Sequence, residues 1–281
     1  MILCCQGREV VQSQVQVPIK GSQELQFAVA VAEKAGAVAL KYFQEGIEAT
    51  YKSDDTPVTK ADRECERLIR EAIAETFPDD DILGEEEGES VAHQGHKGRR
   101  KWIIDPIDGT YNYARAVPIF STLLAFEQDG EVRIGVVVAP GMQEVYYAER
   151  GNGAFRNGKP IHVSAISDLS RSQFGFGAPS RILRDGLWDG LGRIVQATYR
   201  QRAFGDYLGF AHVFDGRAEA HLELGLKVWD VAPMQVIVEE SGGRYCDLEG
   251  GRDVYRGSCL ISNGLVHDQL MRLLLGSDDE D

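Results

Sequence analysis

Two carboxylates three residues apart, Asp105 and Asp108, follow an apolar run and directly precede Gly109 and Thr110. The run at 102–104 is bulky and β-branched, which predicts a buried strand that ends where the following proline removes a backbone donor. We therefore expect both aspartates on an irregular turn, where their oxygens can converge on one point. Such oxygens suit a hard cation such as Mg²⁺, and the amides after Asp108 suit a phosphate. An ordinary Asx turn is the structural alternative.

Three further acidic motifs lie elsewhere in the chain. Glu85 follows a short apolar step and is expected at a strand end, although a solvated acidic run also explains residues 85–87. Asp230 precedes an apolar helical stretch at 234–238 and could simply cap that helix. Asp62 falls in the first turn of another helix, where the helix dipole alone would favour a carboxylate. Each motif has a structural explanation by itself, and their combination shifts the balance towards a metal site.

Taken together, the motifs resemble the inositol monophosphatase family of metal-dependent phosphomonoesterases. The resemblance rests on the sequence D-P-I-D-G-T at 105–110 with W-D-x-A downstream at 229–232, and it runs from about residue 23 to 274. It implies an α/β fold with layered helices and sheets, a five-layer αβαβα sandwich, with the metals between its two halves.

The resemblance also implies roles for individual residues. The implied metal ligands are Glu85, Asp105, Asp108, Asp230 and the main-chain carbonyl of Ile107, with Asp105 bridging two of the two or three Mg²⁺ ions. Asp62 and Thr110 would orient and deprotonate the attacking water. Gly109 and Thr110 would hold the phosphate through their amides, Glu85 and Asp230 would also face the substrate, and Glu86 would be a second acidic residue beside the ligands.

The chemistry of phosphate esters agrees with such a site. A phosphomonoester dianion repels hydroxide, so the enzyme must screen that charge, generate a nucleophile near neutral pH and stabilise the leaving alkoxide, which metal ions can do. The transition state is loose and anionic, so no side chain needs to become phosphorylated. The chain contains no G-x-S-x-G motif, P-loop or C-x-x-C motif.

The identity of the substrate depends on the segment R-A-F-G-D-Y that begins at Arg202. Gly205 precedes a predicted helix at 207–214, so Asp206 lies near the expected pocket unless it only caps the helix. A G-D-[YFC] pattern resembles the histidinol-phosphate phosphatase branch, whereas the inositol-hydrolysing branch usually carries a small residue here. Asp206 and Glu223 suit an ammonium group and an imidazole better than a neutral polyol. Inositol phosphatases also carry a Glu at the second position, and Arg202 either holds the loop or touches substrate.

Three functions follow as hypotheses. The leading one is Mg²⁺-dependent hydrolysis of L-histidinol phosphate to L-histidinol and phosphate, a step of histidine biosynthesis. The second is an inositol-1-phosphate or broad-specificity sugar-phosphate phosphatase on the same scaffold. The third, from another class, is a scaffold or regulatory protein whose metal site only holds a ligand.

The rest of the chain gives the expected organisation. We expect a disordered extension at 1–21, an N-terminal α+β half at 22–160, a C-terminal α/β half at 161–275 and an acidic tail at 276–281. Helical spacing predicts a first helix at 22–43. Strands at 121–126 and 132–139 flank an Asp-Gly step, which predicts a hairpin, and Asn157-Gly158 marks a second tight turn. From about residue 161 we expect strands to alternate with helices.

Charge and cysteine content narrow the partners and the compartment. A net charge of −14 argues against nucleic acid and anionic membranes as partners, because both need a basic surface. The five cysteines show neither zinc spacing nor a paired framework, which favours a reducing cytoplasm. Residues 1–21 resemble neither a signal peptide nor a membrane span. The basic cluster at 93–101 is expected to be a solvated loop or a substrate-gating flap, and the resemblance implies a homodimer.

Overall fold

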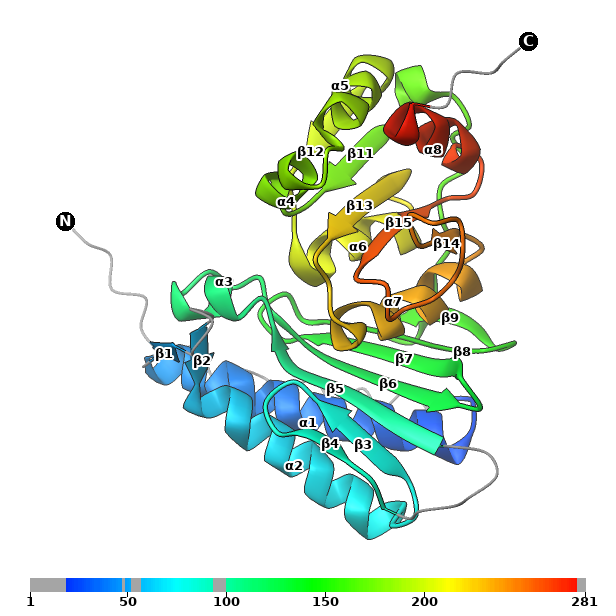
Figure 1. The fold of residues 1–281 in the computed structure, drawn as a ribbon. Helices are drawn as coiled ribbons and strands as arrows, with labels where there is room; N and C mark the ends of the chain where they lie inside the picture. The colour runs from blue at the N-terminus through cyan, green and yellow to red at the C-terminus, as the bar shows by residue number, and fades with distance from the viewer. Residues whose placement is uncertain (1–18, 47–48, 52–56, 93–99, 277–281) are drawn as a thin grey trace, which may run out of the picture.

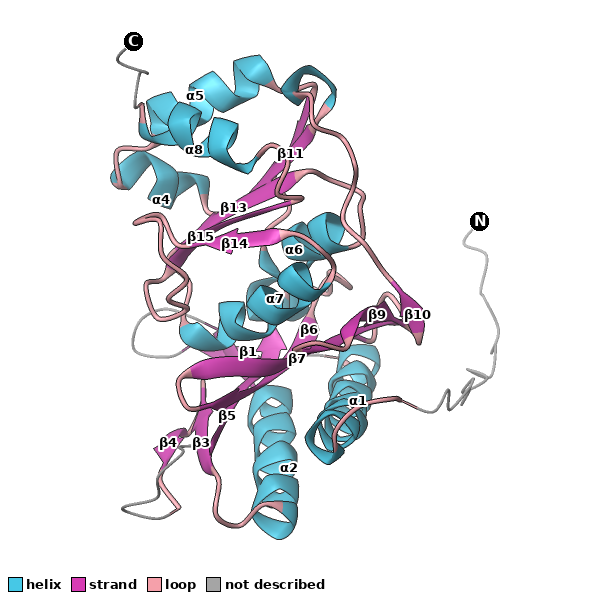
Figure 2. Cartoon of the chain, turned by 90° about the vertical axis from the view of Figure 1, so that its right-hand side faces the viewer, coloured by secondary structure: helices cyan, strands magenta, loops and turns pink. Residues whose placement is uncertain are grey.

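The computed structural model describes residues 19–46, 49–51, 57–92 and 100–276. In these residues the elements stack in five layers of helices and sheets, which Figure 1 and Figure 2 show from two directions. The five-layer αβαβα sandwich expected from the sequence is confirmed. Three hydrophobic cores fill the spaces between the layers, and the middle one extends along both sides of the central helical layer, so the two large sheets are buried on both faces.

The first sheet contains eight strands of the described chain in the order β10-β9-β8-β7-β6-β5-β3-β4. Its strands are β3 (Asp81–Gly84), β4 (Gly88–Ser90), β5 (Arg100–Asp108), β6 (Ser121–Gln128), β7 (Glu131–Ala139), β8 (Glu144–Glu149), β9 (Gly153–Arg156) and β10 (Lys159–Pro160). Neighbours pair antiparallel except β3 with β5. The predicted hairpin joins β6 to β7, and Asp129 and Gly130 take φ of 56° and 81°, as a tight hairpin turn of that hand requires.

Two long helices cover the outer face of this sheet, α1 (Gln23–Glu45) and α2 (Lys60–Thr76) (Figure 1). The first helix begins and ends within two residues of the predicted span. Its N-cap is Ser22, whose hydroxyl accepts the amide of Leu25 at 3.1 Å. A small two-stranded ribbon, β1 (Ala49–Tyr51) with β2 (Pro57–Thr59), leads into α2. The ribbon thereby sets the position at which α2 starts, where Asp62 lies.

The second sheet has five strands of the described chain in the order β12-β11-β13-β15-β14. They are β11 (Gln173–Phe176), β12 (Arg200–Arg202), β13 (Ala220–Leu224), β14 (Arg244–Cys246) and β15 (Ser258–Ser262). Helices α6 (Asp206–Phe214) and α7 (Val228–Glu240) lie between the two sheets; α4 (Pro179–Arg184), α5 (Trp188–Ala197) and α8 (His267–Leu275) cover the outer face (Figure 2). A short 3₁₀ turn, Leu169–Arg171, precedes β11. The expected alternation of strands and helices after residue 161 is confirmed.

Helix α7 rests directly on the first sheet. A side chain at Gly135 of β7 would place its Cβ 2.3 Å from the carbonyl oxygen of Pro233, so only glycine permits this approach. The contact fixes the height of α7 above the sheet and brings the first turn of the helix over the end of β5. Short α3 (Thr110–Ala114) follows β5 at that same end.

The end of β5 differs from the prediction. We expected the strand to stop before Pro106, whereas β5 continues to Asp108. The proline is accommodated by a bulge: Asp105 pairs with Leu123 and Asp108 with Ser121, so one extra residue stands on β5. A bulge is a position where a strand tolerates a missing backbone donor. The expected irregularity between the aspartates is therefore present, inside the strand and not after it.

Several expectations fall outside the described residues. These are the extension up to residue 18, the loop at 93–99 and the tail at 277–281. Arg100 and Lys101, which we had grouped with that loop, are instead the first residues of β5. Cys65, Cys246 and Cys259 are buried free thiols, while Cys4 and Cys5 lie outside the described part. None of the described helices is long and apolar enough to cross a membrane.

Candidate active site

Three aspartates from distant parts of the chain meet at the end of β5. Asp105 and Asp108 come from the bulge of β5, and Asp230 comes from the first turn of α7. One oxygen of each lies within 4.8 Å of one oxygen of both others. Asp230 is not the N-cap of α7, because Lys227 holds that position; Asp230 is the third residue of the helix, and its Oδ2 accepts the Lys227 amide at 2.6 Å in a capping box. The bulge and the capping contact thus aim three carboxylates at one point.

The electrostatics of this cluster call for a cation. Burial, followed by the charge of Glu85, holds the pKa of Asp105 well above its ordinary value, and burial with Asp206 does the same for Asp108. Burial also raises the pKa of Asp230 to about 7. Oδ1 of Asp105 is buried and has no hydrogen-bond partner among the described residues. A buried acceptor of this kind beside two further carboxylates fits a divalent cation, which supplies the missing positive charge.

Glu85 lies in the turn between β3 and β4, and the turn is held from behind by Glu66. The Glu66 carboxylate is fully buried and accepts the amides of Glu86 and Glu87 at 2.8 and 3.1 Å. Arg70 donates to the same carboxylate at 2.8 Å. Glu85 is outside the group of oxygens within 4.8 Å, yet its charge raises the pKa of Asp105, Asp230 and Asp62. The structure therefore brings Glu85 near the cluster and places Glu86 beside it in the turn.

Asp62 and Thr110 approach each other at the edge of the cluster. The Thr110 hydroxyl lies 3.5 Å from Oδ1 of Asp62 and 2.8 Å from the carbonyl oxygen of Ile107, to which it donates. Asp62 also accepts the amide of Thr59 at 2.7 Å, so the helix-stabilising explanation for this carboxylate holds as well. Burial raises the pKa of Asp62 to about 6. Oδ1 faces Thr110, and Oδ2 caps the helix.

The C-terminal half reaches the cluster through the start of α6. The amide of Tyr207 donates to Oδ2 of Asp108 at 2.7 Å. The preceding Asp206 accepts the side-chain amide of Asn112 at 2.8 Å, and its carboxylate lies against Gly109, where a Cβ would stand 3.2 Å from Oδ2. The N-cap of α6 is Gly205, so Asp206 does not cap its helix, contrary to the structural alternative. Burial, followed by the charge of Glu223, raises its pKa to about 6.

Glu223 lies next to this segment, and Arg202 is an exposed residue that precedes it in the chain. Oε2 of Glu223 would be 3.9 Å from a Cβ at Gly205, and the residue is 6% exposed. Nε2 of His221 lies 3.1 Å from the same oxygen. Arg202 ends the edge strand β12, is exposed and donates to the carbonyl of its neighbour Gln201 at 2.8 Å. This contact is local, and a role of Arg202 in holding the loop or in touching substrate stays a prediction.

A profile of the inositol monophosphatase family matches residues 21–277 of this chain. The chain belongs to the inositol monophosphatase family. The histidinol-phosphatase of Chlorobaculum parvum is 39% identical over 259 residues, which are 92% of this chain and 98% of that protein. The fructose-1,6-bisphosphatase/inositol-1-monophosphatase of Thermotoga maritima is 37% identical over 77% of this chain and 82% of that one. The crystal structure of extragenic suppressor protein suhB from Bartonella henselae superposes with a TM-score of 0.83 at 30% identity. The match covers 90% of this chain and 98% of that chain.

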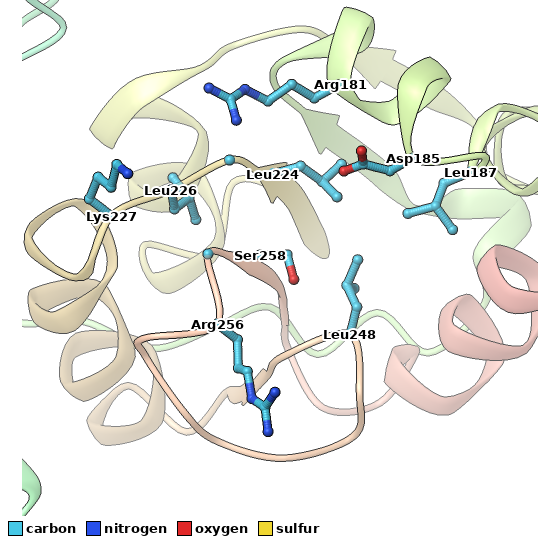
Figure 3. Close-up of a pocket in the computed structure, with 11 residues that line it drawn as sticks. Arg181, Asp185, Leu187, Leu224, Leu226, Lys227, Leu248, Arg256 and Ser258 are labelled. Atoms are coloured by element: carbon cyan, nitrogen blue, oxygen red, sulfur yellow. The ribbon is translucent and has the colours of Figure 1, made fainter.

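Membership of the inositol monophosphatase family makes this chain a phosphomonoesterase and fits the acidic cluster described above. A cavity of about 370 Å³ opens beside the loop that leads into α7 (Figure 3). Its lining includes Arg181, Leu224, Lys227 and Ser258, and none of the three clustered aspartates. The cavity is thus separate from the carboxylate cluster, and Lys227 borders both.

Three participants were missed by the sequence analysis. Asn112 lies two residues beyond Thr110, just after the motif at 105–110, and its link to Asp206 could not be known before the halves were placed together. Glu66 lies four residues after Asp62, on the same face of α2, and this spacing could have signalled it. His221 lies two residues before Glu223, and in a strand this spacing puts both side chains on one face.

Proposed function

We propose that this phosphatase uses Mg²⁺ to hydrolyse a phosphomonoester whose alcohol carries an ammonium group, with L-histidinol phosphate as the substrate. The observation that carries this proposal is the placement of Asp206, which lies beside Gly109 and one residue before the amide that binds Asp108. In this proposal, a carboxylate in that place would face the leaving alcohol of an ester whose phosphate is held by metal ions at the aspartate cluster. A charge-assisted hydrogen bond from an ammonium group is stronger than one from a neutral hydroxyl.

Asp105, Asp108, Asp230 and the carbonyl of Ile107 would hold the metal ions, with Glu85 completing the set. Bound Mg²⁺ supplies charge neutralisation for the phosphate dianion and acidifies a bound water. Mg²⁺ fits because the donors are all oxygens and the cluster holds an acceptor without a partner. Two or three ions per site is our expectation from the family.

Asp62 and Thr110 would handle the proton of the attacking water. The Thr110 hydroxyl donates to the carbonyl of Ile107, so its lone pairs remain available to accept from water. Oδ1 of Asp62 can accept the proton that leaves, and a pKa near 6, raised by burial, suits a base working close to neutral pH. The amides of Gly109 and Thr110 would hold the phosphate oxygens.

The decisive experiment compares kcat/KM for L-histidinol phosphate and inositol 1-phosphate in the wild type and in Asp206→Asn. Asp206 has φ of 56°, and Asn tolerates this left-handed conformation, whereas the β-branched Thr of Asp206→Thr would add backbone strain. We expect the wild type to prefer the amine-bearing ester and Asp206→Asn to lose about ten- to a hundred-fold of that preference. If the ratio of kcat/KM for the two esters is the same in the wild type and in Asp206→Asn, the assignment of Asp206 is contradicted.

A second candidate is an inositol-1-phosphate or broad-specificity sugar-phosphate phosphatase. Buried Glu223 favours it, because a carboxylate also accepts hydrogen bonds from sugar hydroxyls. A phosphate-release screen that includes fructose 1,6-bisphosphate and adenosine 3′,5′-bisphosphate, with EDTA as the control, separates the two candidate functions.

The proposal also includes a homodimer in the cytoplasm, where three buried free thiols would stay reduced. Light scattering would measure the oligomeric state.

A further inference from the structure

His221 is a fully buried histidine for which the proposed chemistry has no use. It is the second residue of β13, two residues before Glu223, so both side chains leave the strand on one face. Its Nε2 is 3.1 Å from Oε2 of Glu223. Histidine and glutamate are rarely buried together unless each satisfies the other.

Two glycines beside this imidazole leave the space that its ring occupies. A Cβ at Gly209 of α6 would lie 2.2 Å from Cε1 of His221, and one at Gly175 of β11 would lie 2.7 Å from Nδ1. The ring of Phe210 packs edge-on at a centroid distance of 4.8 Å. The imidazole is therefore confined to a single orientation, with Nε2 directed at Glu223.

Glu223 is confined in the same way. A Cβ at Gly177 would lie 1.8 Å from Oε2 of Glu223, so the carboxylate rests directly on the backbone of that residue. The same oxygen is also close to Gly205, which immediately precedes Asp206. Glu223 is thus fixed between His221 on one side and the segment of Asp206 on the other.

The hydrogen bond has a defined direction. Nδ1 of His221 is buried and has no partner in the described part of the chain. An N–H at Nδ1 would be a buried donor without an acceptor, which is costlier than an unused acceptor lone pair. Nε2 therefore carries a proton, which it donates to the Glu223 carboxylate.

We propose that His221 is a positioning residue for substrate selection: its Nε2–H fixes Glu223 beside Asp206, so that both carboxylates accept from one ammonium group on the leaving alcohol. The proposal rests on the proposed function for the identity of that group. His221 touches none of the three clustered aspartates, so its loss should weaken binding of the donor-bearing alcohol and leave the phosphate chemistry intact.

The test uses a matched pair of amide substitutions. Gln at 221 can place its side-chain nitrogen where Nε2 lies, whereas the shorter Asn places it near Nδ1 and cannot reach Glu223. His221→Asn should raise KM for L-histidinol phosphate about ten- to a hundred-fold with kcat within about threefold of the wild type. His221→Gln should stay within about threefold in both constants. p-Nitrophenyl phosphate, whose alcohol has no donor, should respond to neither substitution.

Glu223→Gln provides the coupling control. In a Glu223→Gln background, His221→Asn should add nothing to the loss in KM, because the interaction is already removed. Equal behaviour of the Asn and Gln variants, or an equal loss with p-nitrophenyl phosphate, would overturn the proposal and leave His221 a packing residue.

Failure of the proposed substrate would look different. A wild-type enzyme that prefers inositol 1-phosphate refutes the proposal that the leaving alcohol carries an ammonium group. KM of the two His221 variants is then compared with inositol 1-phosphate as the substrate. Glu223 would accept from a neutral hydroxyl, so His221→Asn should raise that KM about three- to ten-fold while His221→Gln does not. Absence of this smaller difference also overturns the positioning role.

Discussion

The aspartate cluster makes the stability of the metal-free protein depend on pH in an unusual direction. Burial, with the charge of Glu85 adding to it, raises the pKa of Asp230 from 3.8 to about 7. A carboxyl with a raised folded pKa binds more protons in the folded chain than in the unfolded chain. Its contribution therefore stabilises the fold as pH falls through the folded pKa and destabilises it as pH rises. Metal-free protein should gain stability from Asp230 between pH 8 and pH 6.

The magnitude follows from proton linkage. With a folded pKa of about 7, Asp230 alone contributes about 1 kcal/mol more at pH 6 than at pH 8. Asp62, whose pKa burial raises to about 6, adds a fraction of this in the same direction. His267 acts in the opposite direction, because burial lowers its pKa to about 4 and the unfolded chain then takes up the proton first. Subtracting the behaviour of an Asp230→Asn variant removes the effects that both proteins share.

The assay is thermal or urea unfolding of wild type and Asp230→Asn in EDTA at pH 6 and pH 8. The gain on acidification should be larger in the wild type by about 1 kcal/mol, or about 2–4 °C in Tm for a chain of this size. Saturating Mg²⁺ should reduce the difference between the two pH values, because the cation competes with protons for the same carboxylates. Equal acid stabilisation of wild type and variant would refute the electrostatic reasoning for Asp230.

Three further predictions concern the neighbours of the cluster. Asp62→Asn should lower kcat for phosphate release about 10²- to 10⁴-fold with an unchanged far-UV circular dichroism spectrum, and near-normal turnover would remove Asp62 from the chemistry. Glu66→Leu should raise the Mg²⁺ concentration for half-maximal activity about 10- to 100-fold, because the turn of Glu85 loses its support; Glu66→Gln, which keeps acceptor and size, should lose less. Hydrogen exchange at the Tyr207 amide should slow when Mg²⁺ holds its acceptor Asp108, and an unchanged rate would show that metal does not order this junction.

Much of the fold was predictable because local rules determined it. The hairpin at Asp129 follows from residues that tolerate positive φ, and the first helix follows from the spacing of small apolar residues. The end of β5 was not predictable from Pro106 alone. A proline can end a strand or sit in a bulge, and only the pairing of Asp108 with Ser121 on the neighbouring strand decides between them.

In the site, too, some residues could be predicted from the sequence, and others depend on contacts that only the fold creates. Asp105, Asp108 and Asp230 were found from the sequence because their motifs also match a family pattern, and the structure brings their oxygens together. Glu66 and His221 belong to no motif, so in the sequence only their spacing from Asp62 and from Glu223 could have signalled them. Their importance comes from what the fold places opposite them, namely the turn of Glu85 and the carboxylate of Glu223.

One hydrogen bond, from the Tyr207 amide to Asp108, connects the residues proposed to select the substrate with those proposed to bind metal. Asp108 contributes an oxygen to the cluster and accepts the Tyr207 amide with Oδ2, and this bond holds the start of α6 in place. Asp206 then takes φ of 56° and turns its carboxylate towards Asn112 and Gly109, which belong to the same segment as Asp108. The carboxylate proposed to choose the alcohol is thus positioned by the segment proposed to bind metal, although it comes from the other half of the chain. A change of substrate by substitution at 206 alone must therefore keep a residue that accepts positive φ, or it will disturb Asp108 and the metal with it.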